Sequence, residues 1–189
     1  MPNWCYNSVE VTHDDPAMVQ KFIDATREGA GFINTFVPVP ADLQIVSGFV
    51  GEDKQAEHEA KQKENIAKHG YKDWYDFCVN EWGTKWDVDC AEAFSKDGAI
   101  HTSFDSAWSP PIAFYEKLAD LGYTVKAYYF EPGMNFAGIW EDGFDDFYEL
   151  SEFADADEVE ANIPVELNEM FDIVQQMRDW EEENEEDEE

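Results

Sequence analysis

The chain has 189 residues, of which 43% are hydrophobic and 15% aromatic, a composition that supports a packed core. Its 44 acidic and 12 basic residues leave a net charge of -32 at pH 7, and residues 140–189 hold 22 of the acidic residues against one base, Arg178. A protein with this charge repels nucleic acid and anionic lipid and attracts basic protein surfaces, so we expect no direct binding to nucleic acid or to a membrane.

The first 40 residues predict a strand, a helix and a second strand. Residues 8–12 alternate between polar and apolar side chains, as in a half-buried strand. Asp14 or Asp15, just before Pro16, marks a helix start in which the carboxylate caps the first turn and the proline occupies it. An extended run over residues 32–39 follows this helix.

Residues 50–86 predict a helical insertion. Its first part, residues 52–69, is almost wholly polar and carries three Glu–Lys pairs four residues apart, which indicates an exposed helix or a loosely held insertion. Residues 73–86 are aromatic and apolar by contrast, so this part must pack against the rest of the domain.

A second half of similar pattern follows the insertion. Residues 88–94 and 99–104 predict two strands joined by Ser95-Lys96-Asp97-Gly98, whose Asp-Gly pair suits a tight hairpin. The remaining elements are a helix opened by Ser109-Pro110-Pro111 and strands over residues 124–130 and 135–140. Two such halves predict an α+β ferredoxin-like fold, in which one antiparallel sheet has helices on one face and the insertion lies between the halves.

The segment after Trp140 looks like an addition to this domain. We divide the chain into a domain over residues 1–140, an acidic linker with an amphipathic helix over residues 141–178, and a disordered acidic tail over residues 179–189. The helix that begins at Pro164 has one apolar stripe, which can dock on the domain or on a partner. Nine of the last eleven residues are acidic, which is typical of a solvated, disordered tail.

Three short segments carry a family resemblance: residues 1–7 (MPNWCYN), 80–87 (NEWGTKWD) and 104–111 (FDSAWSPP). Together with Glu131-Pro132-Gly133 and Phe136-Ala137-Gly138, they resemble the Api92-like or YubB-type ferredoxin-like family of phages and plasmids. The resemblance covers the first 140 residues and implies a fold and a mobile-element origin, not an activity. The acidic segment that follows departs from the family pattern.

The acidic C-terminal segment is the first candidate functional feature. We expect its carboxylates to share one face and to replace phosphates in a basic groove of a host protein, so that the chain acts as a DNA mimic that inhibits a nucleic-acid-binding or defence protein. The alternative is a charge run that only solubilises the protein. The candidate partner-binding residues are Glu141, Asp142, Asp145, Asp146, Glu149, Glu166, Glu169, Asp172 and Asp179.

A group of aromatic residues with one lysine is the second candidate. The group comprises Trp82, Lys85, Trp86, Trp108 and Glu131. These residues can line a cleft in which indole rings stack a base or a cation while the lysine holds an anion, as in a ligand-binding or enzymatic domain. The alternative is that the tryptophans fill space between insertion and sheet, with Lys85 paired to Asp87 or Asp105.

Catalytic and metal-binding motifs are weak. Cys78, Cys90 and His101 could ligate zinc, but no Cys-x-x-Cys or His-x-x-x-His pair enforces the geometry, and reduced structural thiols fit better. No histidine accompanies a recognised nucleophile. We therefore expect a non-enzymatic accessory protein without metal or cofactor. Because no apolar run approaches the roughly 20 residues that span a bilayer, we place it in the cytoplasm; its oligomeric state stays open.

Overall fold

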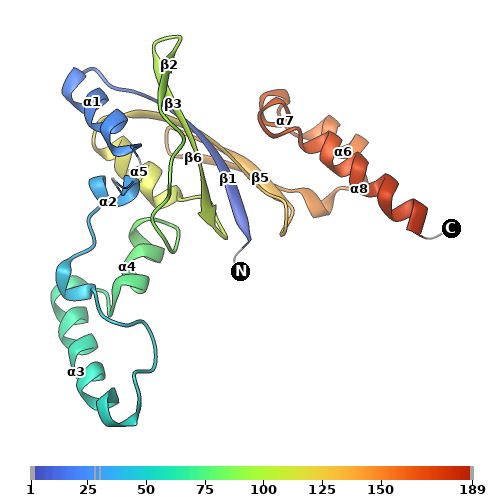
Figure 1. Ribbon diagram of the computed structural model, residues 1–189. Coiled ribbons are helices and arrows are strands. Elements are labelled where there is room, and N and C mark those ends of the chain that lie inside the picture. Colours follow the sequence, from blue (N-terminus) through green and yellow to red (C-terminus); the bar gives the residue numbers. More distant parts are fainter. Residues whose placement is uncertain (1–2, 28, 30, 188–189) are drawn as a thin grey trace.

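The computed structural model describes residues 3–27, 29 and 31–187, which form a mixed α+β fold around a six-stranded antiparallel sheet (Figure 1). The sheet has the strand order β2-β3-β1-β4-β5-β6. Its strands are β1 (Trp4–Thr12), β2 (Phe94–Lys96), β3 (Ala99–Ala107), β4 (Thr124–Glu131), β5 (Phe136–Glu141) and β6 (Phe144–Glu149). The sequence prediction of a mixed fold with an antiparallel sheet is therefore confirmed.

Helices α1 (Pro16–Ala25) and α5 (Ile112–Asp120) cover one face of the sheet, which we call the α5 face. Helix α1 begins as predicted, because the Asp15 carboxylate accepts a hydrogen bond from the Ala17 N–H at 2.8 Å. Phe22 of α1 and Phe114 of α5 are fully buried in the main core cluster. Burial of each such side chain contributes about 1.5–3 kcal/mol.

The C-terminal helices cover part of the opposite face, which we call the α7 face (Figure 1). They are α6 (Ala156–Asn162), α7 (Val165–Phe171) and α8 (Ile173–Asp187), preceded by the 3-10 turn η2 (Leu150–Glu152). Phe130 and Ile139 of the sheet pack there with Leu150, Leu167 and Ile173 in a second buried cluster.

This second cluster corrects the predicted division of the C-terminal part. Residues 141–178 are no linker, because β6 extends the sheet and the helices after it bury one of its faces. Residues 179–187 are helical, where we expected a disordered tail, and residues 188–189 lie outside the described part. Glutamate is a good helix former, and Glu181 accepts a hydrogen bond from the Ala156 N–H at 3.0 Å, which ties α8 to α6.

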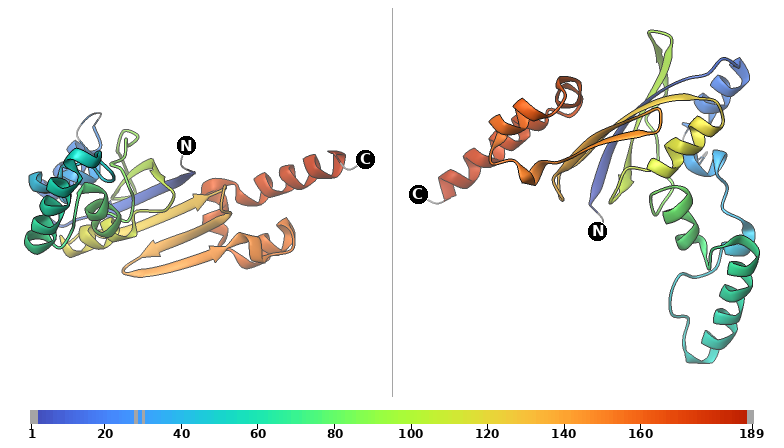
Figure 2. Two further views of the ribbon diagram at one scale, coloured as in Figure 1. Left: turned by 90° about the horizontal axis from the view of Figure 1, so that it is seen from below. Right: turned by 180° about the vertical axis from the view of Figure 1, so that it is seen from behind.

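The predicted insertion is helical. Helix α3 (Glu52–His69) projects away from the sheet, and α4 (Trp74–Glu81) lies between α3 and the body (Figure 2). The side-chain amide of Asn65, buried on α3, donates hydrogen bonds to the carbonyls of Asp42 and Lys72 at 3.0 and 3.1 Å. Asp42 belongs to the 3-10 turn η1 (Ala41–Leu43), so these bonds fix α3 to the chain before and after it.

Two local predictions have different outcomes. The hairpin at Asp97-Gly98 is confirmed, since both residues have positive φ angles, 51° and 89°, and join β2 to β3. The prediction of an extended run over residues 32–39 is wrong, because helix α2 (Phe32–Phe36) forms there. The Asp87 carboxylate caps this helix by accepting from the Ile33 N–H at 2.8 Å.

Candidate functional site

The acidic C-terminal residues gather in one lobe of the molecule. This acidic lobe consists of residues 140–187: its helices α6, α7 and α8 lie on the side of the sheet away from α1 and α5 (Figure 1), and its strand β6 forms an edge of the sheet. Arg178 is the one base within these residues, while Lys126 reaches the lobe from β4. The structure thus separates a strongly acidic part from a part with mixed charge.

Arg178 and Lys126 each contact two carboxylates of the acidic lobe. The Arg178 guanidinium lies 2.8 Å from Asp157 and 2.5 Å from Glu160. The Lys126 ammonium lies 3.0 Å from Glu166 and 3.5 Å from Glu141. Burial alone lowers the pKa of Lys126, but hydrogen bonds that involve Tyr128 and Glu166 outweigh it and raise that pKa above its usual range. Within residues 140–182, whose side chains the structure describes, no other carboxylate forms an ion pair.

The predicted partner-binding carboxylates do not all share one face. Asp145 pairs with Trp140, whose side chain is in the α5-face cluster, whereas Asp146 pairs with Ile139 of the α7-face cluster. Neighbouring strand residues point to opposite faces, so these two carboxylates diverge. The group therefore surrounds the β5–β6 hairpin and continues along the C-terminal helices.

Several of these carboxylates have structural roles. Asp145 accepts a hydrogen bond from the Tyr129 hydroxyl at 2.7 Å, and Glu149 accepts one from Ser151 at 2.8 Å. Asp142 and Asp172 have positive φ angles, 50° and 56°, the former in the β5–β6 turn and the latter at the end of α7. These four residues therefore have roles in the fold that do not depend on a binding partner.

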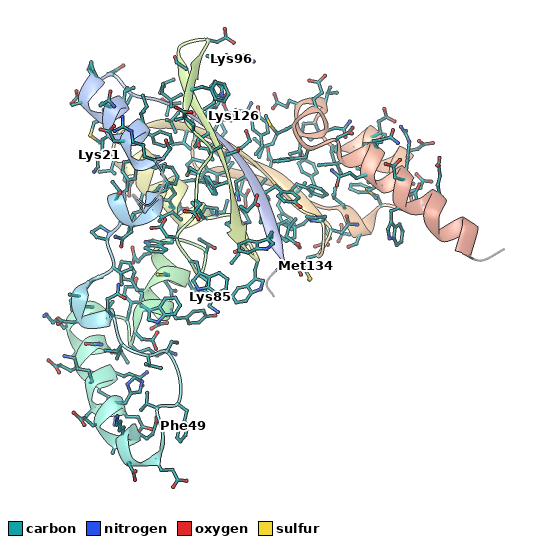
Figure 3. The ribbon with its side chains drawn as sticks, viewed as in Figure 1. Lys21, Phe49, Lys85, Lys96, Lys126 and Met134 are labelled. Atoms are coloured by element: carbon teal, nitrogen blue, oxygen red, sulfur yellow. The ribbon has the colours of Figure 1, made fainter. Side chains whose placement is uncertain are left out.

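Lys85 lies within a ring of aromatic side chains beside α4, at the end of the sheet away from Lys96 (Figure 3). Its ammonium nitrogen is 4.5 Å from the ring centroid of Trp86, 5.1 Å from that of Trp108 and 5.7 Å from that of Tyr75. We call these four residues and Trp4 the Lys85 cluster. No carboxylate among the described residues lies within ion-pair distance of this ammonium group, so neither predicted salt bridge forms.

The indole rings of the Lys85 cluster are half-exposed and in contact. Trp86 stacks on Trp108 with centroids 6.4 Å apart and an interplanar angle of 28°, and it contacts Trp4 at 6.4 Å. All three are 40–45% exposed. Beside them lies a pocket of about 280 Å³, lined by Asn34, Val39, Gln44, Trp74, Cys78, Trp82, Lys85, Trp86 and Asp87. The arrangement offers flat ring surfaces and one ammonium group to a ligand.

Constrained loops hold this cluster in place. Trp108 has a φ angle of 68°, which a bulky residue rarely adopts. Its N–H donates to the Asn3 carbonyl at 2.9 Å, and the Ser109 hydroxyl donates to the Gly83 carbonyl at 2.9 Å. Gly83 has a positive φ angle, and a Cβ there would lie 3.0 Å from the Ile112 nitrogen, so a larger residue would be strained.

Two of the five predicted cleft residues, Trp82 and Glu131, are buried. Trp82 is 4% exposed in the main core and donates its indole N–H to the Val37 carbonyl at 2.9 Å, although one edge of it reaches the pocket. Glu131 is 1% exposed and accepts hydrogen bonds from the N–H groups of Gly133 and Met134 in the β4–β5 turn. Both residues thus have structural roles.

The remaining sequence candidates do not form a site. Across the described residues, no group of three or more His, Cys, Asp and Glu side chains is placed to hold a metal ion. Burial raises the pKa values of Cys78 and Cys90 to about 12, so neither thiol is a ready nucleophile at neutral pH. None of the described helices combines the length and apolar character that crossing a bilayer requires.

Comparisons with known proteins identify no family for this chain. No family model matches it, and no curated protein does. The crystal structure of the protein api92 from Yersinia pseudotuberculosis, which carries the family model DUF1281, is similar at a TM-score of 0.39 and 10% identity. The match covers 79% of this chain and 98% of that one.

Proposed function

We propose that the chain is a non-enzymatic binding protein whose acidic lobe docks on a basic surface of another protein. The observation that supports this most directly is the separation of charge: residues 1–139 contain eleven of the twelve bases, and the acidic lobe contains only Arg178. A concentrated field of one sign steers an oppositely charged partner and accelerates its association. Total charge alone has no such directional effect.

We further propose that the partner is a nucleic-acid-binding or defence protein of a host cell. The acidic lobe would occupy the DNA-binding groove of that protein in place of DNA. Carboxylates on both sides of the β5–β6 hairpin and along α6–α8 suit a groove that surrounds its ligand. We also propose a ferredoxin-like core and a mobile-element origin. Support for the core comes from the strand order β2-β3-β1-β4, with α1 and α5 in the two crossovers.

A test must keep the fold intact. Truncation at Trp140 would remove β6 and uncover the α7 face, so lost binding would only report unfolding. We therefore neutralise four exposed carboxylates of the acidic lobe together: Asp146→Asn, Glu152→Gln, Glu169→Gln and Glu182→Gln. The matched control neutralises four exposed carboxylates elsewhere: Glu52→Gln, Glu57→Gln, Glu116→Gln and Asp120→Asn.

Both variants change the net charge by the same amount, so they separate charge placement from charge total. In a pull-down from host lysate, we expect the wild type and the control to capture a basic protein that the lobe variant loses. Raising the salt from about 0.1 M to about 1 M shortens the screening length from about 10 Å to about 3 Å and should release the captured protein. Equal capture by the two variants would contradict the proposal.

Ligand binding or catalysis at the Lys85 cluster is a second candidate, favoured by an ammonium group whose neighbours are aromatic rings. A planar anion such as adenosine monophosphate could stack on an indole and place its phosphate on Lys85. Quenching of tryptophan fluorescence by this nucleotide tests the idea. Loss of quenching in Lys85→Ala, with quenching kept in the lobe variant above, would support it over the acidic lobe.

A further inference from the structure

Among the described residues, the outward-facing backbone N–H groups of β6 have no hydrogen-bond partner, and the register of the β5–β6 hairpin identifies them. The strands are joined by a two-residue turn, Asp142-Gly143, with positive φ angles at both residues. In such a hairpin the pair that flanks the turn, here Glu141 and Phe144, is hydrogen-bonded. Hydrogen-bonded and non-hydrogen-bonded pairs then alternate along the two strands. The Leu150 N–H, bonded to the Asn135 carbonyl at 2.8 Å, continues this alternation at the far end.

The N–H and C=O groups of Asp145, Phe147 and Glu149 therefore point away from β5. β6 is the last strand in the sheet order, and within the described residues no other group bonds to these three N–H groups. The opposite edge, β2, is only three residues long, whereas β6 has six. β6 is thus the edge at which another strand can add.

From this geometry we propose that an extended basic segment of the partner pairs with β6 as a seventh strand. The inference rests on the proposed function and specifies how the acidic lobe binds. On the α5 face of β6, the carboxylates of Asp145 and Glu149 flank the half-exposed ring of Phe147. Side chains on one face of an added strand are two residues apart. The partner segment that complements Asp145, Phe147 and Glu149 therefore has a basic, an apolar and a basic residue at every second position.

A second copy of this chain does not fit the same edge. Pairing two β6 strands would place the carboxylates of Asp145, Asp146 and Glu149 near those of the other copy. Like charges on neighbouring strands destabilise the pair, and each copy carries a net charge of -32. The same carboxylates that exclude self-pairing therefore favour a basic strand.

The probe is a synthetic peptide with blocked ends, Thr-Lys-Thr-Val-Thr-Lys-Thr, and the readout is residue-resolved amide exchange by NMR. In the free protein, the amides of Asp145, Phe147 and Glu149 should exchange faster than those of Phe144, Asp146 and Tyr148. The peptide should slow exchange at the first three by about tenfold or more, since each gains a hydrogen bond.

Two controls separate strand pairing from charge attraction. The same peptide with N-methyl groups on its pairing amides has equal charge and should bind at least about tenfold more weakly. Phe147→Pro removes one outward N–H, which edge positions tolerate, and should weaken binding, while Phe147→Val keeps that N–H and should bind within about threefold of the wild type.

The outcomes distinguish this inference from the proposed function. Strand addition is overturned if the N-methylated peptide binds as tightly as the unmodified one and exchange at Asp145, Phe147 and Glu149 does not slow. Charge-driven docking of the acidic lobe would still stand in that case. No binding of either peptide at low salt overturns strand addition as well. Lysate capture that does not respond to neutralising the acidic lobe contradicts the proposed function itself.

Discussion

The hydroxyl of Tyr129 on β4 crosses β5 and donates a hydrogen bond to the carboxylate of Asp145 on β6, at 2.7 Å. Gly138 of β5 lies between the two strands, and a Cβ at this position would collide with the Tyr129 ring. Burial, together with the bond to Asp145, raises the pKa of Tyr129 above its usual range, so the hydroxyl stays a donor. This contact ties the acidic edge strand to the buried centre of the sheet.

Gly138→Ala should therefore destabilise the protein by about 1–3 kcal/mol, the usual cost of overpacking. The new methyl group must displace Tyr129 or push against the Asp146 carbonyl. Urea unfolding followed by circular dichroism measures the change. Tyr129→Phe is the matched control, because it removes only the hydroxyl and should cost about 1 kcal/mol. A Gly138→Ala protein as stable as the wild type would show that this crossing contact is dispensable.

Asp42 should make the stability depend on acidic pH. Hydrogen bonds from Lys68 and His69 lower the pKa of this carboxyl from 3.8 to about 2. A pKa that is lowered in the folded state stabilises the fold above the unfolded-state value and ceases to do so as the pH falls through the folded value. The contribution of Asp42 should therefore be complete above about pH 4 and disappear toward pH 2.

The comparison of wild type with Asp42→Asn checks this pH dependence. The urea midpoints should differ at pH 5–7 and converge toward pH 2. Glu64→Gln, which removes the exposed partner of Lys61 at 3.1 Å, is the control and should change little at any of these pH values. A wild-type advantage that persists undiminished at pH 2 would rule out the Asp42 carboxylate as its source.

Local sequence chemistry predicted several elements correctly. Asp15 with Pro16 starts α1, and Asp97-Gly98 turns the β2–β3 hairpin, because each depends only on adjacent residues. Helix α2 could not be predicted in this way, since its cap, Asp87, is 54 residues away from Ile33. Strand β6 was missed because three of its six residues are acidic, a composition that usually indicates an exposed linker.

The candidate sites were predictable to a similar extent. Lys85 and Trp86 are adjacent in the sequence, and Trp108 follows β3 in a recognisable segment. The sequence did not place Trp4 and Tyr75 beside Lys85, because their positions depend on the pairing of β1 with β3 and on the packing of α4. Trp82 and Trp86 look alike in the sequence. Only the structure distinguishes them, because Trp82 is 4% exposed and Trp86 is 40% exposed.

Trp108 offers a test of whether the Lys85 cluster serves packing or binding. Its φ angle of 68° costs an L-residue roughly 1–2 kcal/mol, and glycine avoids this cost. The ring is 45% exposed, so its loss removes only part of the usual burial energy. Trp108→Gly should therefore unfold within about 1 kcal/mol of the wild type and be more stable than Trp108→Ala by about the same amount.

Thermal and urea unfolding of the two variants provide the measurement. A loss of about 3–5 kcal/mol in Trp108→Gly would show instead that the ring is a core residue, as we expect for Trp82→Ala. If Trp108→Gly keeps its stability but no longer responds to adenosine monophosphate, the strained indole serves a ligand.

Truncation separates the structural and acidic parts of the C-terminal segment. A chain that ends at Trp140 lacks β6 and every helical residue that covers the α7 face, so Tyr128, Phe130 and Ile139 become exposed. Three such uncovered side chains cost about 1.5–3 kcal/mol each, which is comparable to the stability of a whole domain. This truncation should lose cooperative unfolding and bind a hydrophobic dye.

A chain that ends at Glu182 provides the matched comparison. It loses residues 183–189, six of which are acidic, but keeps Glu181, Arg178 and the contacts of α8 with α6. Its melting temperature should stay within a few degrees of the wild type, because no residue of the second buried cluster is removed. Its affinity for a basic partner should fall, since the field of the acidic lobe weakens. Loss of cooperative unfolding in this chain too would mean that the last turns of α8 hold the fold, and that the acidic end is structural.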